Sequence, residues 1–156
     1  MTGFYKNATI CLNGHVASET EANYRKFCKS CGEPTISNCQ SCDDLIQGYY
    51  FVSGVFSSAK YNAPNYCHSC GKPYPWTEKL LDNAVELISL DDQLNDEQKQ
   101  IIKNAIPDLI VESPTTALAQ AKYKKYISNS AFYIQDGLKN LLVDVVSESV
   151  KKSLFG

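Results

Sequence analysis

The stretch C-K-S-C-G-E-P-T-I-S-N-C-Q-S-C, residues 28–42, contains two cysteine pairs with two residues inside each pair. This spacing lets both thiolates of a tight turn point at one ion, and Gly32 supplies the left-handed backbone conformation that closes the first turn. We therefore expect residues 28–42 to form two metal-binding turns. Asp43, and not a glycine, follows the second pair, which indicates that the second turn is built differently.

Two further ligand pairs flank this stretch, C-L-N-G-H at residues 11–15 and C-H-S-C-G at residues 67–71. Zinc in structural sites prefers four thiolate or imidazole ligands in a tetrahedron, so eight ligands make two closed sites. The sequence therefore predicts two zinc ions per chain, held by one histidine and all seven cysteines. The expected ligands are Cys11, His15, Cys28, Cys31, Cys39, Cys42, Cys67 and Cys70.

The order in which the pairs combine has two solutions. Sequential pairing puts the first two pairs on one ion and the last two on the other, so that each site is clamped by two turns. Cross-bracing, as in RING-type domains, joins the first pair to the third and the second to the fourth, and the short gap between Cys31 and Cys39 permits it. We favour sequential pairing. Iron–sulfur ligation is an alternative to zinc, because C-x-x-C pairs also hold clusters.

The pattern along the chain predicts an α+β protein with two domains. Histidine and cysteine are absent after residue 70, and the composition changes at the P-Y-P-W-T stretch, residues 73–77. Residues 1–76 contain short strand candidates at 8–12, 35–38 and 48–56. These strands cannot build a large core, so the domain needs an additional stabilising cross-link. We expect a double zinc-ribbon module of short antiparallel hairpins in residues 1–76 and a domain of three to four helices in residues 77–156.

The first two expected helices have recognisable start signals. Thr77 can cap a helix whose apolar residues follow the spacing of one helical face. Asn95 followed by Gln98 resembles a capping box for the second helix. Pro107 should end or kink that second helix, because proline lacks the backbone N–H that a helix interior requires.

The last two expected helices lie beyond residue 112. Ser113 and Pro114 look like an N-cap followed by proline in the first turn, and this third helix should reach Ile127. A final helix over residues 131–154 shows apolar residues at alternating spacings of three and four. Gly137 lies inside it and costs ~1 kcal/mol relative to alanine, so we place a break near that residue.

Composition and charge argue against several classes of function. The formal net charge is -2 and the sequence contains a single arginine, Arg25, which gives no electrostatic case for nucleic acid or an anionic membrane. Residues 1–10 lack the basic and apolar pattern of a secretion signal, and no stretch approaches the ~20 apolar residues of a membrane span. We expect a cytoplasmic protein, in which cysteines are metal ligands and not disulfide partners.

No catalytic residue is assigned. Four protein ligands leave a zinc ion without the open position that catalysis requires, and every cysteine is used. His68 lies inside the last cysteine pair, where we expect an exposed side chain with local hydrogen bonds. The neighbouring carboxylates at 43–44, 91–92 and 96–97 are interpreted as solvated surface residues. The sequence therefore favours a protein that is not an enzyme.

The motifs C-x-N-G-H, F-C-x-x-C-G-x-x-T-I-x-x-C-x-x-C and Y-C-H-S-C-G-K-P-Y-P-W-T resemble those of a family of small uncharacterised bacterial proteins. The resemblance covers Cys11 to Thr77, and beyond Thr77 it rests on a similar helical pattern. It implies a double zinc-ribbon-like head with a helical tail, supports the eight metal ligands and supplies no catalytic residue.

These features favour a non-catalytic zinc-binding adaptor that binds a protein partner or self-associates through its helices. One alternative is nucleic-acid binding through the ribbons and the basic run 122–126, and this run also fits a solvated helix face. A second alternative is action at a membrane surface through the last amphipathic helix, whose polar face has mixed charge. Homo-oligomerisation is compatible with the apolar helix faces.

Overall fold

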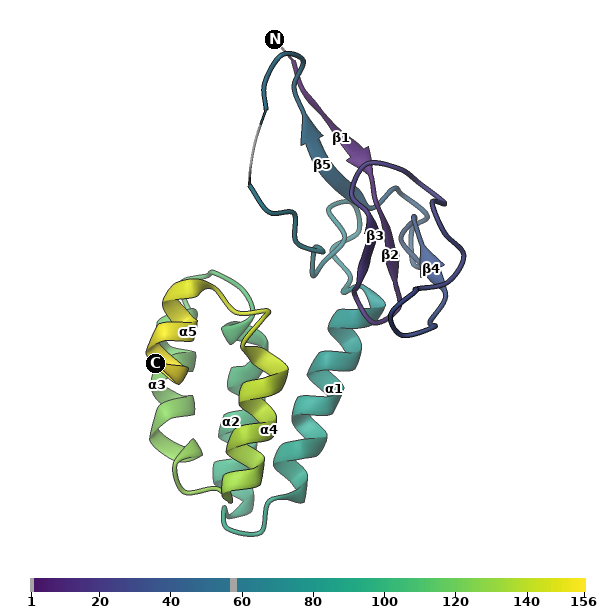
Figure 1. The fold of residues 1–156 in the computed structure, drawn as a ribbon. Helices are drawn as coiled ribbons and strands as arrows, with labels where there is room; N and C mark the ends of the chain where they lie inside the picture. Colours follow the sequence, from purple (N-terminus) through teal and green to yellow (C-terminus); the bar gives the residue numbers. More distant parts are fainter. Residues whose placement is uncertain (1, 57–58) are drawn as a thin grey trace. The chain divides into compact units, whose positions relative to one another are not determined.

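The computed structural model describes residues 2–56 and 59–156 (Figure 1). The chain divides into two compact units, Met1–Lys79 and Leu80–Gly156, and each is described by itself. Short strands and the cysteine-rich turns precede the helices, so the predicted α+β class is confirmed.

The first unit contains short antiparallel strands. The bounds are β1 Phe4–Asn7, β2 Thr9–Cys11, β3 Val16–Ser18, β4 Thr35–Ile36 and β5 Gln47–Phe51. β2 is central in one sheet, with β3 on one side and β4 on the other, and β1 pairs with β5 in a separate ribbon. The strands expected near residues 8–12, 35–38 and 48–56 correspond to β2, β4 and β5, whereas β1 and β3 were not predicted.

A small apolar core lies behind these strands. Ile10 and Ile46 are completely buried in it, and the rings of Tyr74 and Trp76 stack with their centroids 4.9 Å apart. Tyr74 and Trp76 therefore belong to the core, whereas Tyr50 is 49% exposed.

The helices of the described chain number five, where we expected three to four. Their bounds are α1 Pro75–Leu90, α2 Asp96–Leu109, α3 Thr116–Ile127, α4 Phe132–Leu142 and α5 Glu148–Phe155. The additional helix arises because the expected final helix is divided into α4 and α5.

The division lies at residues 143–147 and not near Gly137. Ser147 adopts an extended backbone and its hydroxyl accepts a hydrogen bond from the N–H of Val150 at 3.3 Å, so it starts α5 as an N-cap. Gly137 remains inside α4, where a Cβ atom would lie 3.4 Å from the methyl groups of Leu87. The helix therefore continues through Gly137 despite the low helix propensity of glycine.

The starts of α1 and α2 differ in how well the sequence predicted them. α1 begins at Pro75, and the Thr77 hydroxyl donates to the carbonyl of Asn65 at 2.8 Å, so Thr77 is not an N-cap. Proline is favoured in the first helical turn because its missing N–H has no partner there. The capping box of α2 is confirmed, with Asn95 and Gln98 each accepting from the other's backbone N–H at 2.8 and 3.1 Å.

The boundaries of α2 and α3 differ from two expected positions. Of the two outcomes expected at Pro107, an end of the helix is wrong, because α2 continues to Leu109; a proline so close to a C-terminus disturbs little of a 14-residue helix. α3 begins at Thr116 and not at Pro114, which lies in the preceding turn. The backbone carbonyl of Ser113 stabilises that turn, because it accepts a hydrogen bond from the N–H of Thr116 at 3.1 Å.

The helical unit packs around its own apolar core, and Asp91 is buried beside it. Asp91 is 2% exposed, so its interpretation as a solvated carboxylate is wrong. None of the described helices is both long and apolar enough to span a bilayer. The completely buried apolar residues of the unit are Ala84, Ile88, Ile102, Ile106, Ile134, Leu138 and Leu142.

Candidate metal centres

The C-x-x-C pairs of the described chain all adopt one turn. In each, the carbonyl of the first cysteine accepts a hydrogen bond at 2.9 Å from the N–H four residues later. The N–H of that same cysteine donates to the carbonyl five residues later. The donors four residues later are Gly32, Asp43 and Gly71.

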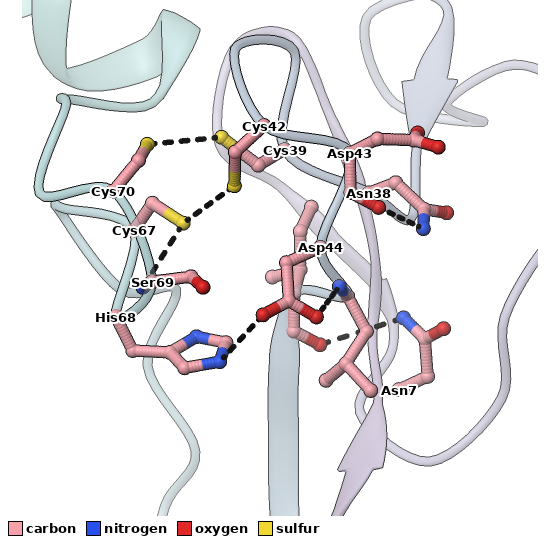
Figure 2. Close-up of polar contacts among 12 residues, drawn as sticks. Asn7, Asn38, Cys39, Cys42, Asp43, Asp44, Cys67, His68, Ser69 and Cys70 are labelled. Atoms are coloured by element: carbon pink, nitrogen blue, oxygen red, sulfur yellow. Dashed lines mark hydrogen bonds and ion pairs between the residues drawn. The ribbon is translucent and has the colours of Figure 1, made fainter.

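Asp43 therefore occupies the position that glycine holds in the other turns. Its φ of 64° lies close to the 77° of Gly32 and the 75° of Gly71. The Asn38 amide also donates to the Asp43 carbonyl at 3.0 Å (Figure 2). The expectation of a different turn is wrong, because aspartate tolerates the left-handed region better than most residues.

The pair Cys11 and His15 is positioned by the tight turn between β2 and β3. The Cys11 N–H donates to the His15 carbonyl, and the Gly14 N–H donates to the Cys11 carbonyl, both at 2.9 Å. Gly14 has a φ of 89°, and a Cβ atom there would lie 3.1 Å from the Trp76 side chain. Glycine is needed for its backbone conformation and for the close approach of Trp76.

The first group of ligands comprises Cys11, His15, Cys28 and Cys31, whose ligand atoms all lie within 4.8 Å of one another. The Sγ atoms of Cys11 and Cys31 are 3.7 Å apart. The Nδ1 atom of His15 lies 3.5 Å from the sulfurs of Cys11 and Cys28. His15 would therefore bind through Nδ1.

The second group comprises Cys39, Cys42, Cys67 and Cys70, again with all ligand atoms within 4.8 Å. Figure 2 shows the sulfurs of the two turns facing one another. The distances from Cys39 to Cys70 and from Cys42 to Cys67 are both 3.7 Å. The groups follow the sequential order of the pairs, and the cross-braced alternative is wrong.

These distances fit a single tetrahedral ion in each group. Zinc–sulfur bonds of ~2.3 Å and zinc–nitrogen bonds of ~2.0 Å imply tetrahedral edges of ~3.8 Å between sulfurs and ~3.5 Å between sulfur and nitrogen. A cluster of several irons and sulfides would hold the cysteine sulfurs farther apart. Each group could thus bind one metal ion, and the cysteines found in the described residues form no disulfides.

The thiols of these groups respond unequally to their surroundings. Backbone N–H groups of Ser30 and Cys31 lower the pKa of Cys28 to about 6. The N–H of Asp44 acts in the same direction on Cys42, but desolvation and the surrounding thiols raise the pKa of Cys42 to about 12. Deprotonation is therefore favoured at Cys28 of the first group and opposed at Cys42 of the second. A cation among the sulfurs would remove that opposition, because metal binding requires and stabilises the deprotonated thiols.

Residues outside the ligand set join the turns of the second group. The Nε2 atom of His68 lies 3.5 Å from the carboxylate of Asp44 (Figure 2), so His68 makes the local contact that we expected of it. A hydrogen bond from Ser69 and the backbone N–H of Leu45 lower the pKa of Asp44. This carboxylate and Ser69 were not recognised from the sequence, because only folding brings residues 44 and 69 together.

The structure brings all eight predicted ligands together in the two groups. Neither group includes a residue beyond residue 70. Because each group supplies four side-chain donors, a tetrahedral ion bound there would have no open coordination position at which a substrate could be activated. The two donor sets are of the kind found in structural zinc sites.

Residues 4–154 match the model of a family described as "Uncharacterized protein conserved in bacteria" (DUF2321). Neither curated proteins nor solved structures give a match. The family model covers nearly the whole chain, including both groups of metal ligands and the helices, so this protein belongs to that bacterial family.

Proposed function

We propose that this chain is a non-catalytic zinc protein in which two structural ions hold the first unit together for binding a protein partner. The observation that carries the proposal is the geometry of the ligand groups, in which four donor atoms lie within 4.8 Å of one another. A reducing compartment such as the cytoplasm fits this role, because the thiols must stay available as ligands.

Zinc is favoured over other metals by the donor set. Three thiolates with one imidazole, and four thiolates, are the usual donor sets of closed tetrahedral zinc sites. The sulfur–sulfur distances of 3.7 Å support a mononuclear ion and disfavour an iron–sulfur cluster. With zinc bound, the ion would supply folding free energy to strands of two to five residues that cannot hold together by packing alone.

The ribbon of β1 and β5 supports a role in protein binding. Phe4, Tyr5 and Tyr50 are each about half exposed on it. Tyr5 and Tyr50 pair across the strands with ring centroids 4.8 Å apart, and they line a cavity of 490 Å³. Exposed aromatic clusters are enriched at protein interfaces, since large rigid rings bury much area at low entropic cost.

Native mass spectrometry tests the metal, and photo-cross-linking tests the partner. We expect two zinc ions per chain; iron with sulfide would contradict the zinc assignment. A photo-reactive amino acid at Tyr50 should give a covalent product of one defined mass in the bacterium. The matched control is Tyr24, which has the same 49% exposure outside the ribbon. Equal labelling from both positions would contradict a partner-binding role for the ribbon.

A further inference from the structure

Asn13 lies inside the first ligand turn, between Cys11 and His15, yet it is not itself a ligand. Its side-chain Nδ2 atom lies 3.4 Å from the Sγ atom of Cys31 and donates to it. Cys31 is exposed, whereas Cys11 and Cys28 of the same group are buried. Among the cysteines of the group, the amide thus contacts the one that is exposed; the other exposed ligand is His15.

Lys79 fixes the direction of this amide. The ammonium of Lys79, in the first part of α1, donates to the Oδ1 atom of Asn13 at 2.8 Å. An ammonium group has no acceptor, so it must meet the amide oxygen and not the nitrogen. With the oxygen on Lys79, the NH₂ group is directed at Cys31.

We propose that Asn13 is a positioning residue of the first metal site, which holds the exposed Cys31 thiolate on the ion, and that Lys79 orients it. The inference rests on the proposed metal occupancy. A hydrogen bond to a thiolate removes part of its charge and limits its rotation away from the ion. Partners outside the ligand set typically change metal affinity 10- to 100-fold, because they orient the ligands.

The second group offers an internal reference in the same molecule. There, Cys39 and Cys67 accept hydrogen bonds from the backbone N–H groups of Ser41 and Ser69, each at 3.4 Å. A substitution at Asn13 leaves these bonds in place. The effect of Asn13 is therefore expected at the first group alone.

Asn13→Asp separates a positioning role from a merely structural one. The carboxylate keeps the acceptor for Lys79 and strengthens that contact into an ion pair, but it removes the donor to Cys31 and faces the thiolate with negative charge. If Asn13 only tied the turn to α1, this variant would retain metal as well as the wild type does. Lys79→Met leaves the donor present but unoriented. Gln40→Ala, an exposed change inside a turn of the second group, is the control.

The experiment challenges the zinc-loaded full chain with EDTA in the presence of N-ethylmaleimide, and peptide mass spectrometry follows alkylation of Cys31 and Cys42. In Asn13→Asp, Cys31 should be alkylated about 10-fold faster or more, with Cys42 unchanged. Lys79→Met should give a smaller acceleration, and Gln40→Ala none at Cys31. Rates at Cys31 within twofold of wild type in Asn13→Asp would overturn the inference. A wild-type chain that carries no ion in native mass spectra would instead overturn the proposed function.

Discussion

Replacing Asp91 with alanine should strongly destabilise the helical unit, because this carboxylate is buried and hydrogen-bonded. One carboxylate oxygen accepts from the N–H groups of Gln93 and Leu94 at 2.9 and 2.7 Å, and the other accepts from Ala131 at 2.7 Å. Asp91 thereby ties the segment between α1 and α2 to the residue that precedes α4, across 40 positions of sequence.

The size of the effect follows from these contacts. Hydrogen bonds to a charged group contribute ~1.5–3 kcal/mol each, and a buried donor left without a partner carries a similar penalty. Water can reach some of the released N–H groups, since only the bond to Leu94 is fully buried. We therefore expect Asp91→Ala to cost ~3–5 kcal/mol, at the upper end of single substitutions. Asp91→Asn keeps one oxygen acceptor and should lie between alanine and wild type.

The assay is urea denaturation of the zinc-loaded chain, followed by helical circular dichroism. Asp92→Ala is a matched control, because the neighbouring Asp92 carboxylate is exposed and accepts a hydrogen bond from the Gln93 side chain at 3.1 Å. Surface changes of this kind stay within ~0.5 kcal/mol of wild type. A difference below 1 kcal/mol between the two alanine variants would refute the role of Asp91, on the scale of ~1–3 kcal/mol for one unsatisfied donor.

The contribution of Asp91 should also depend on pH. Burial acts to raise the pKa of Asp91, but the N–H groups of Ala131, Leu94 and Gln93 outweigh it and hold the pKa below its usual value. A depressed pKa in the folded state means that the stabilisation is complete above the unfolded value of ~3.9 and is lost as the pH falls through the folded pKa. The stability difference between wild type and Asp91→Ala should shrink in that acidic range.

Three further changes test other parts of the structure. Asp43→Gly should change stability very little. Asp43→Val should cost ~1–2 kcal/mol and speed metal loss from the second group, because a β-branched residue disfavours a positive φ. Denaturation measures the stability change, and release of metal to EDTA measures the rate of metal loss. Removing the metal at neutral pH should abolish the amide NMR dispersion of the first unit but spare that of the helical unit, which has its own core. Gly137→Ala should stabilise the helical unit by ~0.5–1 kcal/mol in urea denaturation, because helix propensity improves and a Cβ atom would meet Leu87 at an ordinary contact distance of 3.4 Å.

The ligand groups were the part of the structure that sequence predicted best, and the reason is local. A C-x-x-C turn is determined within six residues, so its spacing and its glycine are visible without knowledge of the fold. The capping box of Asn95 and Gln98 was predicted for the same reason. Ser147, which caps α5, offered an equally local signal, but the uninterrupted apolar spacing on either side of it concealed the division of the helix.

Features that depend on distant partners were missed. β1 pairs with β5 across 40 or more residues of sequence, and its four residues carry no periodic pattern of their own. Asp91 looks like an ordinary turn carboxylate until Ala131 is placed beside it. Asn13 stood inside a recognised motif, but its contact with Cys31 required the turns to be assembled.

The arrangement of the first unit indicates that the proposed metal binding would be coupled to folding. Cys39 and Cys67 belong to the same buried cluster as Ile10, Tyr74 and Trp76, so the second group of ligands forms part of the apolar core. The first group reaches that core through Gly14, whose backbone packs against Trp76. An ion that changed ligands during a reaction would disturb the packing on which strands of a few residues depend. This coupling favours ions that stay bound and a function exercised at the protein surface.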